Sequence, residues 1–571
     1  MQILPEPANF YMSSTTIRTR SVPSAAEATL RMQGFTALQA RLLAARGAVE
    51  ASQSPDLLLP YVDLKGVLPA AEFIARQIEA GRRLCVIADY DADGATACAV
   101  MVRGLRALGA DIGYKVPDRM KHGYGLTPAI VEEAFELSPR PQVLITVDNG
   151  IASNAGVSRA MELGMEVVVT DHHLPADEDV ATPYVVNPNQ RQCGFGSKAL
   201  AGCGVAWYTV WAVRDYLMRS DVDLMALLPI VAVGTVADVV PLDFNNRLLV
   251  REGISLIRDG NCIPAITALA KIGSRDQQNL TTTDIAFSIG PCINAAGRLS
   301  TVDMGIECLL TDDMGRAEEL AKGLFETNTE RKGVEAEMVN DAIGELVAGI
   351  RPEQFSVVLR GDDWHAGVIG IVAGRVRELV NRPTFVMAPD GAGGYKGSGR
   401  SIPGFHLRDA LDLVSKRQPG LLTKFGGHAM AAGLTLAPGA FEGFCDAFEA
   451  VSKELLTDEM LERVLDTDGS LPDEFRTLDV AHWMRSQMWG QAFPEPLFVD
   501  EFAVVDHRAV GADKSHLQLT LARGGSCYKA IRFRHGDAAV PERVRVAYSL
   551  GVNRWREQDS LQLLVQYLEA A

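Results

Sequence analysis

Three short apolar runs, each followed by acidic or histidine residues, constrain this chain more than any other feature. Residues 84–89 (LCVIAD), 143–150 (VLITVDNG) and 166–173 (EVVVTDHH) are separated by segments with helical spacing. Strands that alternate with helices of about 10–15 residues predict a parallel sheet buried between helices. Because the carboxyl ends of parallel strands meet at one edge of a sheet, we expect the polar residues after these runs to share a ligand-binding crevice.

Four groups of carboxylates and histidines follow such runs and carry the candidate chemistry. The last of them, Asp238, follows a fourth apolar run in VGTVADVVPL, which we expect to be another strand. Unpaired carboxylates at the buried edge of a sheet would repel and desolvate one another. A divalent cation reverses that cost, and carboxylate and imidazole ligands without thiolate favour Mn²⁺ or Mg²⁺ over structural zinc. The groups are Asp89, Asp91 and Asp93; Asp148; Asp171, His172 and His173; and Asp238.

A single loop aspartate is most often a solvated side chain or a helix N-cap, so none of these residues indicates a metal alone. The metal interpretation depends on the succession of four groups. A P-loop is excluded, because the glycine-rich stretch at 391–399 lacks the pattern G-x-x-x-x-G-K-[ST].

The remaining patterns predict an α/β protein of several domains, as its 571 residues suggest. The first 20 residues predict a loose tail, and residues 440–480 are acidic and helical, which favours a solvated connector. Later segments (HLQLTL, VRVAYSL and LQLLVQYL) alternate with period two and predict a small β-barrel such as an OB-fold. The expected boundaries are a tail and lead-in at 1–55, a parallel-sheet domain at 56–320, a long connecting helix at 321–348, a second α/β domain at 349–470, and a connector with the barrel at 471–571.

The charge balance limits how the chain can bind nucleic acid. Lys and Arg number 55 against 72 Asp and Glu, a formal charge of −17 that excludes a uniformly basic surface. A local basic region occurs at 523–557, where eight basic and three acidic residues give +5 and Tyr528, Phe533 and Trp555 are interleaved. OB-folds bind single strands with this mixture of cations and stacking rings, although a solvated charged face would show the same pattern.

The cysteines and the apolar runs indicate a cytoplasmic protein. The nine cysteines are scattered without a C-x-x-C pair, as expected of buried thiols in a reducing compartment. No run of about 18 apolar residues predicts a membrane span. The N-terminus lacks the order of a signal peptide, and Met12 is an alternative natural start that would leave the first 11 residues outside the native chain.

The four groups and several further motifs resemble, in order, those of the DHH phosphoesterase superfamily. They are most similar to its RecJ family of single-strand-specific exonucleases, over about residues 60–570. In WGQAFPEPLF the family usually has a Gly-Asn pair before Pro-Glu-Pro, a departure that concerns one local loop. The further motifs are VPDRMKHGYGL, GPCINAAGRLS, DDWHAGVIGIVAGRV, GSGRSIPGFHL, FGGHAMAAG, PEPLF and GVNRWREQDSLQLLVQ.

The resemblance implies a role for each matching residue. His173 would contact the scissile phosphate or assist proton transfer, Asp171 would orient the histidines, and Asp89 would be a supporting ligand. A lone arginine most often forms a surface ion pair and a lone histidine is often a core residue, so the next assignments depend on the motifs. The implied ligands of two metal ions are Asp91, Asp93, Asp148 (bridging), His172 and Asp238, and the implied substrate-binding residues are Arg119, Arg298, Ser398, Arg400 and His428.

The resemblance further implies an enzyme that uses two divalent cations, Mn²⁺ or Mg²⁺, to degrade single-stranded DNA from the 5′ end to 5′-mononucleotides in repair and recombination. Two ions generate an attacking hydroxide at neutral pH and neutralise the developing charge. The implied partners are a single-strand-binding protein and a helicase, and we expect a monomer. One alternative is a phosphodiesterase for short oligonucleotides or cyclic dinucleotides, which the basic barrel disfavours. The other is an inactive binding scaffold, which the intact ligand set disfavours.

Overall fold

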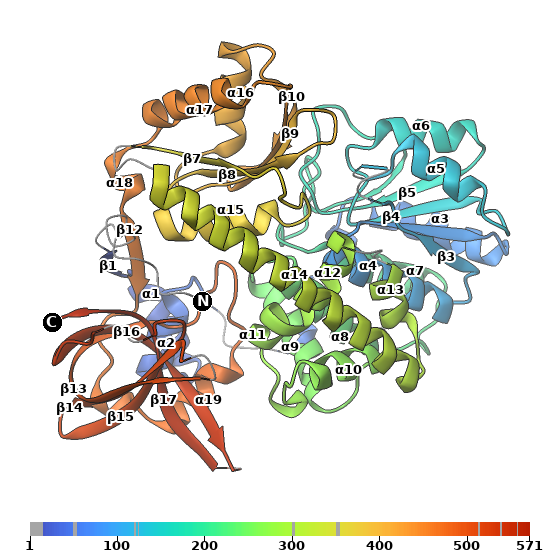
Figure 1. Cartoon of the computed structure of the whole chain (residues 1–571). Coiled ribbons are helices and arrows are strands. Elements are labelled where there is room, and N and C mark those ends of the chain that lie inside the picture. Colours follow the sequence, from blue (N-terminus) through green and yellow to red (C-terminus); the bar gives the residue numbers. More distant parts are fainter. Residues whose placement is uncertain are drawn as a thin grey trace. The chain divides into compact units, whose positions relative to one another are not determined.

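The computed structural model of the chain describes residues 15–49, 54–118, 122–123, 125–299, 303–349, 354–511, 514–536, 539–556 and 558–571. These residues form two compact units, whose elements are labelled in Figure 1. No helix within the described ranges has the length and apolarity needed to cross a membrane. The first unit combines Ser21–Asn328 with Thr477–Pro496, and the second combines Thr329–Arg476 and Leu497–Ala571 with the segment that ends at Arg20.

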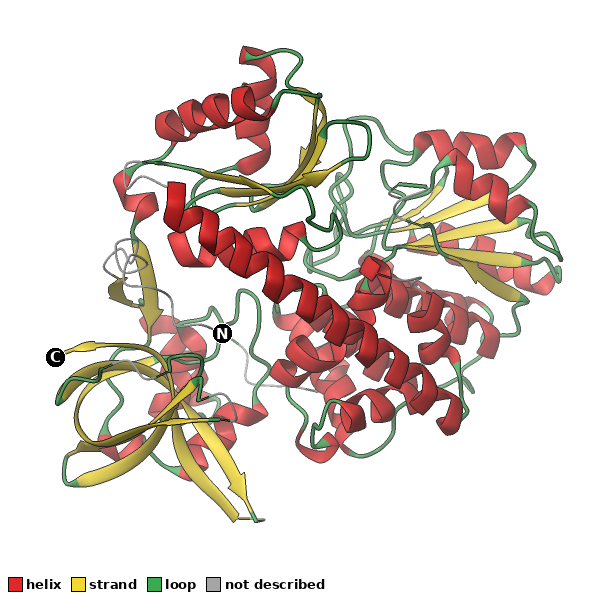
Figure 2. Cartoon of the chain, in the orientation of Figure 1, coloured by secondary structure: helices red, strands yellow, loops and turns green. Residues whose placement is uncertain are grey.

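The first unit is built on a five-stranded sheet in the order β3-β2-β4-β5-β6 (Figure 2). All neighbouring strands run parallel, which confirms the predicted sheet. The apolar runs of the sequence form its three central strands, and β2 and β4 are buried along their whole length. The bounds are β2 (Leu84–Ala88), β3 (Ile112–Lys115), β4 (Val143–Val147), β5 (Glu166–Thr170) and β6 (Tyr184–Val186).

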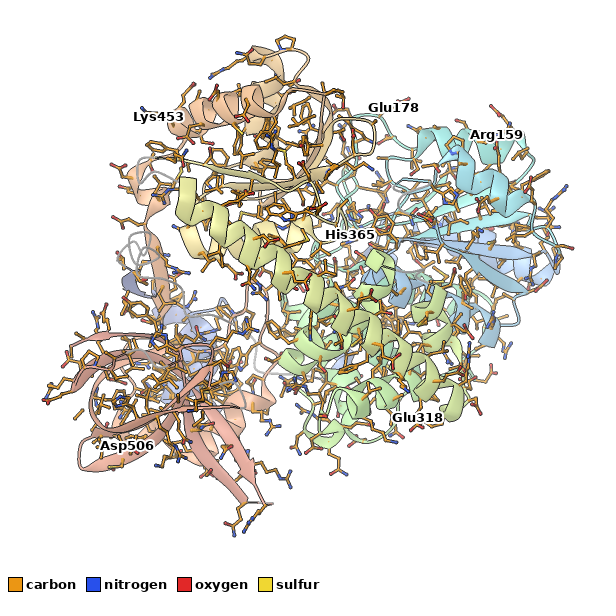
Figure 3. All side chains as sticks on the ribbon, viewed as in Figure 1. Arg159, Glu178, Glu318, His365, Lys453 and Asp506 are labelled. Atoms are coloured by element: carbon orange, nitrogen blue, oxygen red, sulfur yellow. The ribbon has the colours of Figure 1, made fainter. Side chains whose placement is uncertain are left out.

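Helices cover both faces of this sheet, because successive side chains of a strand point to opposite sides. Val86 belongs to the core on one face and its neighbour Ile87 to the core on the other. Arg159, on the second face, pairs with Glu132 and Glu162 at the surface (Figure 3). The helices on the side of Val86 are α3 (Val67–Glu79), α4 (Ala92–Ala107) and α7 (Gly202–Tyr216); those on the side of Ile87 are α5 (Pro128–Phe135) and α6 (Asn154–Glu162).

Further helices complete the first unit. A π-helical turn over Ile285–Ile289 leads directly into α12, which carries part of the predicted site. These helices are α1 (Ser24–Met32), α2 (Ala37–Ala44), α8 (Leu228–Ala237), α9 (Phe244–Arg258), α10 (Pro264–Ile272), α11 (Thr282–Asp284), α12 (Gly290–Leu299), α13 (Asp303–Leu310) and α19 (Leu478–Ser486).

The predicted strand before Asp238 is wrong, because this apolar run forms helix α8. Every residue from Leu228 to Thr235 is buried, so the run has no polar face that would show helical periodicity. A helix buried on all sides and a buried parallel strand have the same apolar appearance in a sequence. Asp238 therefore follows the carboxyl end of a helix.

The second unit contains a mixed sheet in the order β10-β11-β9-β8-β7, in which β7 and β8 are parallel and the other neighbours antiparallel. Helices α16 and α17 pack on one face, and α15 with the end of α14 packs on the other. The bounds are β7 (Val357–Arg360), β8 (Thr384–Pro389), β9 (Tyr395–Arg400), β10 (Leu422–Gly427), β11 (Ala431–Leu436), α15 (Ile369–Val380), α16 (Leu407–Arg417), α17 (Phe441–Leu455) and α18 (Asp458–Leu461).

The predicted solvated connector at 440–480 is wrong over most of its length. Phe444 and Phe448 of α17 are fully buried, and Phe448 lies 5.1 Å from Phe385 of the sheet between ring centroids. Glu442, Asp446 and Glu454 are exposed on its outer face and give the stretch its solvated appearance. Strand β12 (Arg463–Thr467) then pairs in parallel with β1 (Thr15–Thr19).

The pairing of β1 also corrects the prediction of a loose tail over the first 20 residues. Residues 1–14, which include Met12, lie outside the described ranges. The Arg18 guanidinium donates to both carboxylate oxygens of Asp466, at 2.6 and 3.1 Å.

The long helix is present as α14 (Met314–Gly349) and begins ahead of residue 321. Asp313 starts it by accepting a hydrogen bond from the Arg316 backbone N–H at 2.6 Å.

A closed five-stranded barrel ends the chain and confirms the prediction from period-two alternation. Its strands follow the order β13-β14-β15-β17-β16, with β15 and β17 parallel. A buried ion pair fastens the barrel to the preceding segment: Arg476 donates to Asp500 at 2.6 Å and to the Tyr548 hydroxyl at 2.7 Å. The bounds are β13 (Phe498–Val510), β14 (His516–Arg523), β15 (Ser526–Arg532), β16 (Arg543–Trp555) and β17 (Gln558–Ala570).

Candidate metal centre

The predicted ligands converge at the carboxyl edge of the first unit's sheet. The Nε2 atom of His172 lies 3.0 Å from Oδ1 of Asp148, 3.6 Å from Oδ2 of Asp238 and 3.9 Å from Oδ2 of Asp93. Within the described residues, three sets bring their ligand atoms within 4.8 Å of one another. They are Asp89, Asp91 and Asp148; Asp93, His172 and Asp238; and Asp148, His172 and His173.

The turn after β2 presents its carboxylates by starting helix α4. Asp91 is the N-cap and accepts a hydrogen bond from the Gly94 N–H at 2.9 Å. The backbone N–H of Ala92, the first residue of the helix, donates to Oδ1 of Asn294 on α12 at 2.8 Å. A Cβ at Gly94 would lie 2.5 Å from the Asp89 carbonyl oxygen, so this tight turn requires glycine. The α4 start is therefore fixed from two sides.

Asp93 belongs to α4, and its carboxylate reaches the N-terminus of helix α7. Free N–H groups and the helix dipole stabilise negative charge at such a position. Its two carboxylate oxygens accept hydrogen bonds from Gly202 N–H at 2.5 Å and Cys203 N–H at 3.0 Å. A Cβ at Gly202 would lie 2.6 Å from the Cβ of Asp148. Glycine at 202 therefore lets the helix end approach the two carboxylates closely.

Asp148 adopts a left-handed backbone conformation, with φ of 61°. Aspartate tolerates this conformation better than most residues, but it remains sparsely populated and is typical of functional sites. The neighbouring Asn149 side chain donates to the carbonyls of Ile87 and Val147, which holds the end of β4 in place. The side chain of Asp148 is thus fixed between the other carboxylates.

Asp171 organises the two histidines that follow it. Its Oδ1 accepts hydrogen bonds from the backbone N–H of His172 at 2.7 Å and from the backbone and Nδ1 of His173 at 3.0 and 2.8 Å. On the other side of this turn, Asn187 and Asn189 donate to the carbonyls of His173 and His172. The histidine pair is therefore held by its backbone as well as by its rings.

The electrostatics of the centre are unfavourable without a cation. Burial, together with the neighbouring carboxylates, raises the pKa of Asp148, Asp89 and Asp238 well above their ordinary value. Burial also raises the pKa of Asp93 and lowers the pKa of His172. A buried neutral imidazole is the form that binds metals.

The pKa of His173, the second histidine, is raised, whereas that of His172 is lowered. Burial alone would raise the pKa of Asp171, but the hydrogen bond and charge of His173 lower it. Burial likewise opposes protonation of His173, yet its hydrogen bond to Asp171 and the nearby carboxylates raise its pKa to about 9. The two adjacent histidines are thus tuned to different protonation states.

These residues fit divalent cations. Asp148 Oδ1, His172 Nε2 and Asp238 Oδ2 are buried and have no hydrogen-bond partner among the described residues. Buried polar atoms without a partner are rare and costly, and a cation satisfies all three at once. The donor set of carboxylate oxygens with one or two imidazoles is the type that suits Mn²⁺ and Mg²⁺.

Two predicted phosphate ligands lie together on β9 in the second unit. The Arg400 guanidinium donates to the Ser398 hydroxyl at 3.1 Å. A Cβ at Gly370, near the N-terminus of α15, would lie 2.9 Å from Nη2 of Arg400 and from Oγ of Ser398. The start of this helix therefore lies directly beside the two side chains.

The other three predicted substrate residues are placed to different extents. His428 follows β10 at an exposed turn, so it is not a core histidine, and its backbone N–H donates to Ala431 at 2.8 Å. Arg298 belongs to α12, but its side chain lies outside the described part of the chain. Arg119 lies wholly outside it.

The basic region of the barrel is smaller than its sequence suggests. Within the described residues, carboxylates engage at least four of its eight cations, in pairs of 2.7 to 3.8 Å. Phe533 is 57% exposed, Tyr528 packs against Phe502, and the side chain of Trp555 is outside the described set. The paired residues are Arg523 with Asp500, Arg543 with Glu501, Arg545 with Glu569, and Arg554 with Asp559.

Sequence reasoning missed the amides that support the centre. Asn294 lies in the GPCINAAGRLS motif, from which only Arg298 was selected, and Asn187 and Asn189 follow β6 without any acidic neighbour. Their hydrogen bonds join segments up to about 200 residues apart in the sequence. Of these three amides, only Asn294 belongs to a motif, so the sequence carried no signal for Asn187 or Asn189.

Three family models match the chain. The DHH family N-terminal domain matches residues 83–235, the DHHA1 domain matches 353–454, and the RecJ OB domain matches 467–567. The three matches fall on the parallel-sheet region, the mixed-sheet region and the barrel.

Curated relatives align over nearly the whole chain. The single-stranded-DNA-specific exonucleases RecJ of Salmonella typhimurium and Escherichia coli are each 42% identical over 549 residues, which is 92% of this chain and 94% of theirs. The RecJ protein of Thermus thermophilus is 34% identical over 507 residues, 88% of this chain and 70% of its own length.

Solved structures show the same fold. RecJ from Thermus thermophilus in complex with Mn²⁺ has a TM-score of 0.82 at 30% identity and covers 98% of this chain and 80% of that one. Its complex with Mg²⁺ has a TM-score of 0.76 at 28% identity, with coverage of 98% and 79%.

Proposed function

This chain belongs to the RecJ family of single-stranded-DNA-specific exonucleases, and we propose that the carboxylate–histidine cluster at the edge of its sheet is the centre that cleaves the DNA. The enzyme is a metal-dependent 5′-to-3′ exonuclease that hydrolyses single-stranded DNA to 5′-mononucleotides and acts in repair and recombination. Its cofactors are divalent cations, Mn²⁺ or Mg²⁺. The observation that carries the proposal is the convergence of three unpartnered buried ligand atoms on one point.

Two ligand sets, one that includes Asp148 and one that lies beside it, suit a pair of cations. Asp89, Asp91 and Asp148 form one set, and Asp93, His172 and Asp238 form the other. The Nε2 of His172 lies 3.0 Å from Oδ1 of Asp148, which supports the proposal that Asp148 would serve both ions. Bound together, two divalent cations activate water and neutralise the charge that develops on a phosphodiester.

His173 is the group in this centre best placed to act on the phosphate. Asp171 accepts a hydrogen bond from its Nδ1, and we assign contact with a phosphate oxygen, or transfer of a proton, to its Nε2. Its side chain is 35% exposed, against 13% for His172, so it can reach a substrate. Asp171 positions this ring and does not itself contact the substrate.

A second anion site would bind the 5′ end of the strand. Ser398 and Arg400 present a hydroxyl and a guanidinium beside the N-terminus of α15, and helix starts of this kind bind phosphate. His428 lies in the turn between β10 and β11, and β11 pairs with β9 along the stretch that carries Ser398 and Arg400. Arg119 and Arg298 are proposed as further phosphate ligands on the strength of their motifs.

We propose a corresponding division of labour between the regions of the chain. The parallel-sheet domain (56–320) carries the metal chemistry, the connecting helix (321–348) leads to the second α/β domain (349–470) with its anion site, and the barrel (471–571) captures the strand. Exposed Phe533 and the neighbouring Arg534 provide a stacking ring and a cation for single-stranded DNA.

We also propose the partners, the oligomeric state and the location of this enzyme. A single-strand-binding protein and a helicase would supply and expose the strand, and the enzyme would act as a monomer in the cytoplasm. None of the nine cysteines, all of which the structure describes, forms a disulfide, and five of them are buried, as suits a reducing compartment.

End-labelled DNA tests the proposed function. With Mn²⁺, a single strand labelled at its 5′ end should lose the label at once as a mononucleotide, whereas a 3′-labelled strand should shorten gradually. A blunt duplex should resist, and EDTA should stop the reaction. Preferential cleavage of cyclic dinucleotides or very short oligonucleotides would favour the phosphodiesterase alternative, and early loss of the 3′ label would contradict the polarity.

A further inference from the structure

The backbone of Val239, the residue directly after the proposed metal ligand Asp238, is strained. Its φ is 62°, and of the described non-glycine residues with a left-handed backbone, Val239 is the only β-branched one. A branched Cβ crowds the main chain in this conformation, so valine adopts it only where the surrounding structure forces it. The side chain is 61% exposed, so its packing does little to offset this cost.

The chain is fixed on both sides of Val239. Helix α8 ends with a hydrogen bond from the Asp238 N–H to the Gly234 carbonyl at 2.9 Å. Beyond Val239, the N–H of buried Leu242 donates to the Gln491 carbonyl at 2.8 Å. Val239 therefore follows the capping residue of the helix, at the position where the chain turns away and where glycine is the usual residue.

Asp238 differs from other ligands of the centre in how its side chain is held. The carboxylates of Asp91 and Asp93 accept hydrogen bonds from backbone N–H groups. By contrast, Oδ2 of Asp238, which lies 3.6 Å from Nε2 of His172, is buried without a hydrogen-bond partner among the described residues. The position of this oxygen therefore depends on the main chain at the end of α8.

We propose that Val239 is a positioning residue for the metal centre, because its restricted left-handed backbone fixes the direction in which Asp238 leaves the end of α8. The proposal rests on the assignment of Asp238 as a metal ligand. Strained residues of this kind organise a site before its ligand binds, and their cost appears as a lower stability of the fold.

Glycine and alanine at this position separate the backbone of Val239 from its side chain. Glycine has no Cβ, so it adopts the left-handed conformation without strain and also reaches many other conformations. Alanine lacks the two methyl groups of valine but keeps Cβ, and with it the restriction of the backbone. A role of the backbone therefore predicts a loss in Val239→Gly that Val239→Ala does not share.

Met218 provides the matched control. It directly follows the capping residue of helix α7, with φ of 53° and an exposed fraction of 87%. The metal centre lies at the opposite end of that helix, where the Gly202 N–H donates to Asp93. Met218→Gly therefore relieves the same kind of strain in the same unit without touching the centre.

Thermal melts in EDTA and calorimetric titration with Mn²⁺, both on full-length variants, test the proposal. Val239→Gly and Met218→Gly should each melt about 2 °C above the wild type, because both lose backbone strain. Only Val239→Gly should bind Mn²⁺ about tenfold more weakly, a loss typical of residues that support a metal ligand. Val239→Ala should bind Mn²⁺ within about twofold of the wild type, because its Cβ still restricts the backbone.

Cleavage provides a third measurement. Val239→Gly should cleave single-stranded DNA more slowly at limiting Mn²⁺ and reach the wild-type rate at saturating Mn²⁺. A residue needed only for folding would not show this recovery together with a higher melting temperature.

Several results would overturn the proposal. They are an unchanged Mn²⁺ affinity in Val239→Gly, an equal loss in Met218→Gly, or an equal loss in Val239→Ala, which would assign the effect to the methyl groups. Asp238→Asn separates this proposal from the metal assignment. Weak Mn²⁺ binding in Asp238→Asn with normal binding in Val239→Gly would refute only the role of Val239, whereas normal binding in both would refute the metal centre as well.

Discussion

The Nε2 atom of His172 lies 3.0 Å from Oδ1 of Asp148, and neither atom has a hydrogen-bond partner among the described residues. The two residues follow neighbouring strands of the parallel sheet, so their contact is a direct consequence of the βα connections. A cation between or beside two buried polar groups this close would stabilise both of them.

The hydrogen bond from Ala92 to Asn294 should matter for catalysis although Asn294 is not a ligand. Asn294→Ala frees an N–H at the start of α4 and loosens Asp91 and Asp93. We expect about 10- to 100-fold weaker Mn²⁺ binding with a corresponding loss of cleavage. Titration of Mn²⁺ by calorimetry measures this loss, with Asn279→Ala, an amide elsewhere in the unit, as the control. Unchanged Mn²⁺ affinity would show that Asn294 has only a packing role.

Glu495 should make the first unit less stable at alkaline pH. Burial raises its pKa to about 7 from an ordinary value of 4.5, although the Arg46 charge opposes the shift. The folded chain therefore holds a proton that the unfolded chain loses, so the free energy of unfolding falls as the pH rises from about 4.5 to 7. Glu495→Gln should raise stability at pH 8 by the order of 1–3 kcal/mol and leave it unchanged near pH 4.5.

Thermal melts at several pH values test this expectation. Exposed Glu474→Gln is the matched control and should melt like the wild type at every pH. A Glu495→Gln variant that gains nothing at pH 8 would show that the carboxylate is already well solvated.

The 5′ end group of the substrate should report on Arg400. If Ser398 and Arg400 bind the terminal phosphate, a 5′-phosphorylated strand is cleaved faster than a 5′-hydroxyl strand. Arg400→Ala removes a charge-assisted contact and should reduce this preference by about tenfold. Competition between the two substrates measures the ratio, and Arg408→Ala on the exposed side of α16 serves as the control. An unchanged ratio in Arg400→Ala would remove the end-binding role.

Phe533 should contribute to capture of long strands. Phe533→Ala removes an exposed ring whose stacking on a base is worth roughly 1–3 kcal/mol, so the Kd for a long single strand should rise about tenfold. Short oligonucleotides that reach only the cleavage centre should be degraded at the wild-type rate. Val505→Ala, at another exposed apolar residue of the barrel, is the control. Equal losses for both variants would mean that the barrel has no specific stacking site.

The sheet and the convergence of acidic and histidine residues at its edge could be predicted because strand ends are a local property of the sequence. Asp89, Asp148 and His172 each follow a run that is buried on both faces, and parallel topology brings such residues together. Asp238 reaches the cluster from the carboxyl end of a helix and not of the predicted strand, because α8 is buried on all sides and has no periodic polar face.

The features that could not be predicted depend on contacts between distant segments. Strand β1 exists because it pairs with β12 about 450 residues later, and the acidic stretch at 440–480 conceals Phe444 and Phe448. The charge of the barrel was overestimated for a similar reason, since Arg523 is engaged by Asp500, which a count of residues cannot show.

Replacement of Asp148 is the most direct test of the account, because this carboxylate belongs to one ligand set and lies against His172 of the other. With Mn²⁺ present, Asp148→Asn should cleave single-stranded DNA at least about a hundredfold more slowly, since even residues that only support a metal ligand cost 10- to 100-fold. Binding of the strand should stay within about twofold, and the variant should melt at a higher temperature than the wild type in EDTA, because burial raises the pKa of Asp148 and its charge destabilises the metal-free fold. Near-normal cleavage by Asp148→Asn in Mn²⁺ would contradict the account.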